Sequence, residues 1–135
     1  MSGSSGPVWL SEAQVRMLHS ETLRLFGGAV GLRDAALLDS ALDHPRNKWQ
    51  YDPGTSVFGL AAAYGFGIAR SHPFVDGNKR AALLAMRAFL FISGYYLKPD
   101  EIETVTVVEG LAAGTVDEGS VTGWIESNAV ERGTE

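Results

Sequence analysis

Hydrophobic residues recur at helical spacing along much of the chain, and capping residues mark where several helices begin. Ser11-Glu-Ala-Gln14 has the pattern of a capping box, and apolar positions follow it at helical spacing as far as Gly27-Gly28. Asp34 can cap a second, short helix, which we expect to end at His44-Pro45 because the residue before a proline disfavours helical backbone. Residues 46–54 are then predicted to form an exposed connection.

The middle of the chain predicts two helices separated by a polar loop. Thr55 or Ser56 can begin a third helix that runs to Arg70, and its many small residues would let a neighbouring backbone approach closely. Asn78 to Ser93 is apolar nearly all round and stops at Gly94, which is typical of a helix in the middle of a bundle.

The C-terminal part is less uniform. Asp100-Glu-Ile-Glu103 repeats the capping pattern and would open a fifth helix toward Gly114, but residues 104–108 alternate and are β-branched, so helix and strand both stay open. Residues 120 to about 130 predict a last amphipathic helix, and the polar tail 131–135 should fray. With residues 1–7 as a disordered leader, the pattern predicts a single all-α domain over residues 8–130, a compact bundle of about six short helices.

Composition narrows the function classes. The chain has 135 residues, a net charge of −5 and no cysteine, so a disulfide framework, a thiolate metal site and a cysteine nucleophile are excluded. The absence of cysteine suits a reducing, cytoplasmic location. Val57 to Ala69 is too short for a membrane span, which needs about 20 residues, and residues 1–7 lack the features of a secretory signal. The acidic balance argues against direct binding of nucleic acid.

Candidate chemistry is concentrated in His72-Pro-Phe-Val-Asp-Gly-Asn-Lys-Arg80, which leads into the predicted helix at Asn78. Lys79 and Arg80 at the start of that helix oppose its dipole, which disfavours cations there by about 0.3–1 kcal/mol per group. The conflict disappears if an anion is bound, because the free N–H groups, the dipole and both cations then point at the same phosphates. Gly77 would let the backbone come close to that anion.

The other motif residues complete a site for nucleotide transfer chemistry. Asp76 can hold a Mg²⁺ that bridges phosphate oxygens, His72 can accept a proton from an attacking hydroxyl, and Phe74 can anchor the loop in the core. Taken singly, each has an ordinary structural explanation: Asp76 as a helix cap, His72 as a loop residue. Only the order and spacing of these residues together favour a functional site over separate structural roles. His19 and His44 lack such support and are predicted to be structural, and the histidine spacing does not suit zinc.

At this point the sequence resembles the Fic/Doc family, and more closely its Doc, or death-on-curing, branch. His72 to Arg80 satisfies every position of the family motif, and weaker similarity extends over segments 27–34, 37–42, 61–70 and 94–95. The resemblance implies a Fic/Doc-like helical bundle in which His72 deprotonates a target hydroxyl, Asp76 binds Mg²⁺ and residues 77–80 (Gly77, Asn78, Lys79 and Arg80) hold the phosphates of ATP. It favours a helix over 101–113. It also implies that residues 46–52, with Lys48, Trp49 and Gln50, correspond to a flap that aligns the target chain. The alternative is an irregular loop whose Trp49 packs into the core.

Two departures from the AMP-transferring Fic pattern favour a kinase. Position 79 is lysine where that branch has glycine, and position 83 is leucine where it usually has a second arginine. Both resemble Doc, which implies transfer of the terminal phosphate to a protein Ser or Thr, in the best-known branch on a translation elongation factor. The alternatives are an AMP transferase and a non-catalytic partner-binding module. Thr122 to Glu126 resembles the self-restraining Fic motif, but Ser127 breaks it, so restraint by a Phd-like antitoxin is expected.

Overall fold

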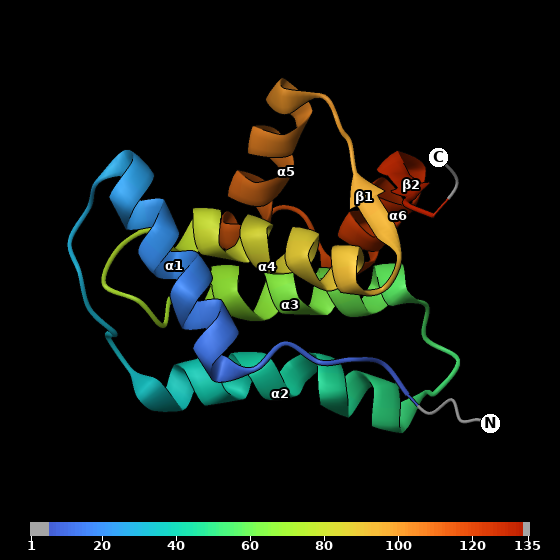
Figure 1. The fold of residues 1–135 in the computed structure, drawn as a ribbon, viewed down its shortest axis with the longest axis horizontal. Helices are drawn as coiled ribbons and strands as arrows, with labels where there is room; N and C mark the ends of the chain where they lie inside the picture. Colours follow the sequence, from blue (N-terminus) through green and yellow to red (C-terminus); the bar gives the residue numbers. More distant parts are fainter. Residues whose placement is uncertain (1–5, 134–135) are drawn as a thin grey trace.

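The computed structural model describes residues 6–133 and consists almost entirely of helices (Figure 1). Over these residues the all-α prediction is confirmed, with a two-stranded antiparallel sheet as the only addition. The elements are α1 (Glu12–Phe26), α2 (Ala35–Tyr51), α3 (Val57–Ser71), α4 (Asn78–Ile92), β1 (Tyr95–Leu97), α5 (Glu101–Ala113), α6 (Glu118–Asn128) and β2 (Ala129–Glu131).

Helix α3 forms the centre of the bundle, and the other helices pack around it and α4 (Figure 1). Its small residues make this possible. A Cβ added at Gly67 would lie 2.8 Å from the Ala41 carbonyl oxygen of α2, and one at Gly65 would collide with Met86 of α4. Helix α4, predicted to lie in the middle, has a buried face, but Arg87 and Phe91 are exposed on its other side. The most buried helix is therefore the one that precedes the motif loop.

The predicted caps are present and set several helix boundaries. Ser11 and Gln14 form the reciprocal capping box of α1, and Ser56 caps α3 through the Gly59 N–H. Asp100 accepts a hydrogen bond from the Glu103 N–H and opens α5, so the segment that alternated in sequence is helical. Thr104 and Val108 of this segment are buried one turn apart, which explains why a helix satisfies its hydrophobic pattern.

Helix α2 does not end at His44-Pro45. It continues through Pro45 to Tyr51, so the exposed connection predicted for residues 46–54 is wrong over its first six positions. A proline inside a helix removes one backbone hydrogen bond and costs about 3 kcal/mol. Tertiary contacts offset that cost: Pro45 itself is buried, and Trp49 packs edge-on against Trp9 in the core, with ring centroids 6.2 Å apart.

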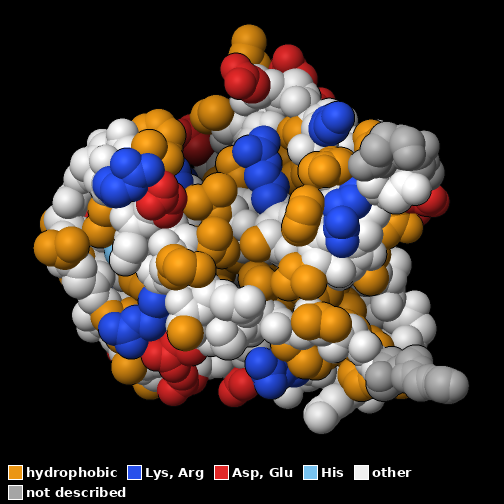
Figure 2. Space-filling model, viewed as in Figure 1, with side chains coloured by type: hydrophobic (Ala, Val, Ile, Leu, Met, Phe, Trp, Pro, Cys, Tyr) orange, Lys and Arg blue, Asp and Glu red, His pale blue; other side chains and the backbone are white. Residues whose placement is uncertain are grey.

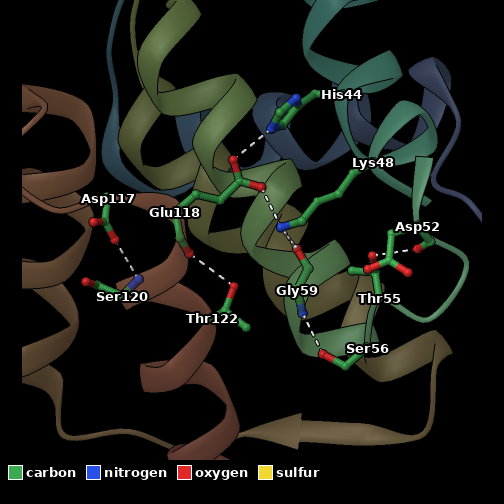
Figure 3. A network of polar contacts seen from close by, with 10 residues as sticks. All are labelled: His44, Lys48, Asp52, Thr55, Ser56, Gly59, Asp117, Glu118, Ser120 and Thr122. Carbon is green, nitrogen blue, oxygen red and sulfur yellow. Dashed lines mark hydrogen bonds and ion pairs between the residues drawn. The ribbon is translucent and has the colours of Figure 1, made fainter. Parts of the chain in front are cut away.

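Helix α2 is also tied to α6 through Glu118 and to α3 through Lys48 (Figure 3). His44 Nε2 lies 2.8 Å from Glu118 Oε1, and Lys48 Nζ donates to Glu118 Oε2 at 2.7 Å and to the Gly59 carbonyl at 3.0 Å. Burial raises the pKa of the Glu118 carboxyl, but the hydrogen bonds from His44 and Lys48 outweigh burial and leave the pKa below its ordinary value. Glu118 therefore joins α6 to α2 as a carboxylate, and Lys48 extends the junction to α3.

The C-terminal segment is more ordered than the sequence pattern suggests. Helix α6 ends at Asn128, and β2 pairs with β1 in antiparallel register, with Glu131 opposite Tyr95. The Arg132 N–H donates to the Gly94 carbonyl at 2.9 Å. The predicted fraying is thus wrong for residues 131 and 132. Residues 134–135 of the predicted tail and 1–5 of the predicted leader lie outside the described part of the chain.

A shallow apolar groove lies between α1 and β1 over α4, on the face where Figure 2 shows many hydrophobic side chains. It has a volume of about 430 Å³ and is lined by Leu18, Leu84, Arg87, Ala88, Phe91, Tyr95, Tyr96 and Leu97.

Among the helices of residues 6–133, none combines the length and hydropathy needed to span a membrane.

Candidate active site

A pocket of about 490 Å³ lies where the motif loop enters α4, with α5 forming its opposite wall. This volume falls in the range of small-ligand sites. One side carries the motif residues, and the α5 side has two apolar and two polar residues. The lining residues are His72, Val75, Asp76, Gly77, Asn78, Lys79, Arg80, Leu83, Thr104, Val105, Val108 and Glu109. The motif residues therefore line one pocket, apart from Pro73 and Phe74, which are buried.

The first turn of α4 is open to a ligand. Gly77 is its N-cap in the left-handed conformation, with φ of 77°, and within the described chain no side chain caps this helix. The first backbone bond runs from the Ala81 N–H to the Gly77 carbonyl. The N–H groups of residues 78–80 thus remain at the positive end of the helix dipole, which is a favourable position for phosphate.

Lys79 and Arg80 flank this turn with partners that an anion can displace. Lys79 Nζ lies 3.8 Å from a Glu109 carboxylate oxygen of α5, and both side chains are more than half exposed. The Arg80 guanidinium carbon lies 4.3 Å from the centroid of the exposed Phe26 ring. Such exposed contacts contribute about 1 kcal/mol or less. Both cations are consequently available to bind phosphate.

The Asn78 side chain closes the motif loop rather than facing a ligand. Its Nδ2 donates to the Phe74 carbonyl, and its Oδ1 accepts from the Phe74 N–H, each at 2.9 Å. Both ends of the amide are therefore engaged. A contact from Asn78 to phosphate would come from its backbone N–H.

Phe74 anchors the loop as predicted, and His19 supplies the surface it rests on. Phe74 is 2% exposed, and its ring stacks on His19 with centroids 3.7 Å apart. His19 Nε2 lies 2.7 Å from the Asp76 carbonyl oxygen, so that nitrogen carries a proton and donates. His19 is therefore structural, as expected, but it supports the site directly. No local signal links it to a residue 57 positions away.

Asp76 is not the cap of α4. Its Oδ1 accepts from the Gly77 N–H at 2.8 Å, and its Oδ2 accepts from the Ala29 N–H at 3.3 Å. The side chain is exposed, and both oxygens retain lone pairs toward the pocket. Residues 6–133 contain no group of three or more acidic, histidine or cysteine side chains arranged for a metal. One carboxylate suits Mg²⁺, which takes its remaining ligands from phosphate oxygens and water.

His72 ends α3 in a strained backbone conformation at the pocket wall. With φ of 51° and ψ of 57° it is left-handed, and among residues 6–133 it is the single non-glycine residue with positive φ. Its side chain is exposed and lines the pocket together with Asp76. Residues held in such conformations cluster at functional sites.

Lys48, Trp49 and Gln50 do not lie beside this pocket. They belong to the last turns of α2, where Lys48 binds Glu118 and Trp49 packs on the core, while Gln50 is exposed. The loop conformation expected for them is wrong because tertiary contacts extend the helix. Their target-aligning role stays a prediction. The contribution of α5 to the pocket wall, by contrast, could not be predicted from the sequence, because no local pattern links Val105 or Glu109 to the motif.

Comparison with known proteins places the chain in a family. A model of the Fic/DOC family matches residues 9–90, which include α1 to α3, the motif loop and most of α4. The chain belongs to the Fic/Doc family. In this chain the motif His72 to Arg80 lies inside the matched range, in the loop after α3 and the first turn of α4.

Two relatives point to the Doc branch of Fic/Doc. "Toxin Doc" of Mycolicibacterium smegmatis is 41% identical over 76 residues, which cover 56% of this chain and 58% of that protein. "Protein kinase doc" of Escherichia phage P1 is 29% identical over 112 residues, 83% of this chain and 88% of that protein. The chain thus spans little more than half the length of the first relative and most of the second.

Proposed function

We propose that this Fic/Doc protein transfers the terminal phosphate of ATP to a Ser or Thr hydroxyl of a protein, as the toxin of a toxin–antitoxin pair. The observation that carries the proposal is the uncapped N-terminus of α4, where Lys79 and Arg80 face a pocket that also holds His72 and Asp76. Phosphoryl transfer depends mainly on positioning of the reactants and neutralisation of their charge. These four side chains and the helix N-terminus include the types of group that the reaction needs.

Each residue has a defined task in this proposal. The N–H groups of the first turn of α4 bind phosphate oxygens, and Lys79 and Arg80 leave their weak partners to neutralise the same group. Asp76 would hold a Mg²⁺, which supplies charge neutralisation between phosphate oxygens. His72 accepts the proton of the attacking hydroxyl.

The choice of phosphate over AMP transfer rests on the residues beside the anion site. Leu83 lines the pocket one turn after Lys79, so an apolar side chain stands where AMP-transferring relatives usually have an arginine for the terminal phosphate. Lys79 adds charge and bulk where they have glycine. The relative named a protein kinase covers most of this chain, which supports the same choice.

The proposed partners are a protein target and an antitoxin. Within residues 6–133, helix α6 contributes nothing to the pocket wall, so the segment Thr122 to Glu126 is not positioned to restrain the site. A Phd-like antitoxin would supply restraint from outside, in keeping with the relative named a toxin. For the target we propose a translation elongation factor, approached past the exposed side chain of Val75 in the pocket wall. No direct contact with nucleic acid is involved.

The experiment is intact-mass spectrometry of a purified translation elongation factor after incubation with the protein, Mg²⁺ and ATP. We expect a gain of one phosphate with wild type, and none with His72→Ala or Asp76→Asn. Asp43→Asn is the matched control, because Asp43 is exposed on α2 and does not line the pocket. This control should retain full activity.

Two other results would contradict the proposal and indicate a different function. A gain of one adenylate would identify an AMP transferase. If no adduct forms, and wild type and His72→Ala arrest growth equally when expressed, the chain is a partner-binding module and His72 has no catalytic role.

A further inference from the structure

We propose that Arg33 is a positioning residue for His72, because its guanidinium holds the backbone turn that directs the imidazole to the pocket. This inference rests on the proposed function, since it takes His72 to be the proton acceptor. It adds a residue from the loop between α1 and α2, which does not line the pocket within the described chain.

The first step is the strain at His72. A residue with a Cβ disfavours the left-handed region, yet His72 has φ of 51° and ψ of 57° there. Such a conformation persists only where surrounding contacts determine it. The His72 N–H bonds to the Ile68 carbonyl at 3.2 Å, but that bond belongs to α3 and does not select the following turn. Something beyond the helix must hold the residue.

Arg33 supplies that contact with two short hydrogen bonds. Its Nε donates to the His72 carbonyl at 2.7 Å, and its Nη2 donates to the Ser71 carbonyl at 2.8 Å. These carbonyls end α3, where the helix leaves acceptors without internal partners and its dipole is negative. A planar, permanently charged fork matches two adjacent acceptors, whereas a lysine offers one point charge. Arg33 thus fixes both peptide planes around the strained residue.

The backbone around Arg33 is bound to the motif loop by main-chain hydrogen bonds that do not involve the Arg33 side chain. The N–H groups of Arg33 and Asp34 donate to the Pro73 carbonyl at 2.7 and 3.1 Å. Leu32 forms an antiparallel bridge with Phe74. Truncating Arg33 leaves these main-chain contacts in place and removes only the bonds to residues 71 and 72. We therefore expect a kinetic defect with an otherwise intact fold.

The test compares Arg33→Ala and Arg33→Lys with Arg132→Ala in the full chain. Arg132 is a matched control, because its Nε donates to the Phe91 carbonyl at 2.7 Å near the end of α4, away from the pocket. Rates of phosphate transfer to the purified elongation factor are measured against ATP concentration.

Arg33→Ala should lower kcat roughly 10- to 100-fold, because a displaced catalytic group loses its alignment, with KM for ATP within about twofold. Arg33→Lys should recover part of kcat through one remaining bond. Arg132→Ala should leave kcat and KM within about twofold of wild type.

The outcomes separate this inference from the proposed function. If His72→Ala abolishes transfer but Arg33→Ala keeps kcat within about twofold of wild type, Arg33 does not position His72. A fall in kcat that merely tracks the unfolded fraction, measured by circular dichroism, would also overturn the inference. If wild type transfers nothing, the proposed function fails. The amide and ring NMR signals of His72 then decide: they should shift in Arg33→Ala but not in Arg132→Ala, and unchanged signals would refute the positioning role.

Discussion

Replacing Glu118 by glutamine should destabilise the protein by removing the charge that joins α6 to α2. The carboxylate side chain is 19% exposed and accepts from Lys48, itself 30% exposed, and from His44, which is 37% exposed. A glutamine offers one acceptor oxygen, so one of the two donors would face an amide N–H₂ instead. The Lys48 nitrogen would keep only the Gly59 carbonyl as a partner.

The magnitude follows from the burial of the two contacts. A largely buried hydrogen bond to a charged group contributes about 1.5–3 kcal/mol, and an exposed ion pair about 0.2–1 kcal/mol. The Lys48 contact lies nearer the first range, and the more exposed His44 contact nearer the second. A loss of about 2 kcal/mol is expected, or roughly 5–10 °C in Tm for a domain of this size.

The pH dependence gives a second, independent check. The pKa of Glu118 is lower in the folded protein than its ordinary value of 4.5, which the unfolded chain retains. The stabilisation is therefore fully present above about pH 4.5 and is lost as pH falls through the folded-state pKa. The difference in Tm between wild type and Glu118→Gln should be largest near neutral pH and shrink in acid.

The assay is thermal denaturation by circular dichroism at several pH values. Glu12→Gln is the control, because its ion pair with Arg16 is about half exposed on both sides, so Tm should fall by less than about 2 °C. An unchanged Tm for Glu118→Gln at neutral pH would refute the assignment of stability to this junction. A difference in Tm that is equal at neutral and acid pH would refute its electrostatic origin.

Three further predictions concern the motif loop. Asn78→Ala should lower the free energy of unfolding in urea by about 1–3 kcal/mol, because the Phe74 N–H and carbonyl lose their partners; no change would mean that water replaces the amide. Gly77→Ala should cost about 1–2 kcal/mol in the same assay, because the residue has φ of 77° and its Cβ would lie 3.2 Å from Thr22 Oγ1. Asp76→Asn should remove the Mg²⁺-dependent part of the Tm increase caused by ATP, measured by differential scanning fluorimetry, while Tm without nucleotide moves by less than about 3 °C. An undiminished Mg²⁺ effect would show that the ion binds elsewhere.

The features that depend on near neighbours in the chain were determined by the sequence alone. Capping side chains, glycine stops and helical spacing act within a few residues, so they identified where α1, α3 and α5 begin. The motif from His72 to Arg80 is equally local, so the order of its residues was enough to propose a site there, and the structure brings those residues to one pocket.

The tertiary structure decided what depends on distant contacts. Helix α2 passes through Pro45 because Trp49 and Lys48 contact residues far away in the sequence, and β2 forms because β1 lies beside it. Local propensity favours ending the helix at the proline, and only the summed packing of its last turns reverses that preference. The supports of the site have the same origin: His19 and Arg33 reach the motif across 57 and 39 positions of sequence. Hydrogen bonds over such separations form only when the chain has folded, so no local pattern records them.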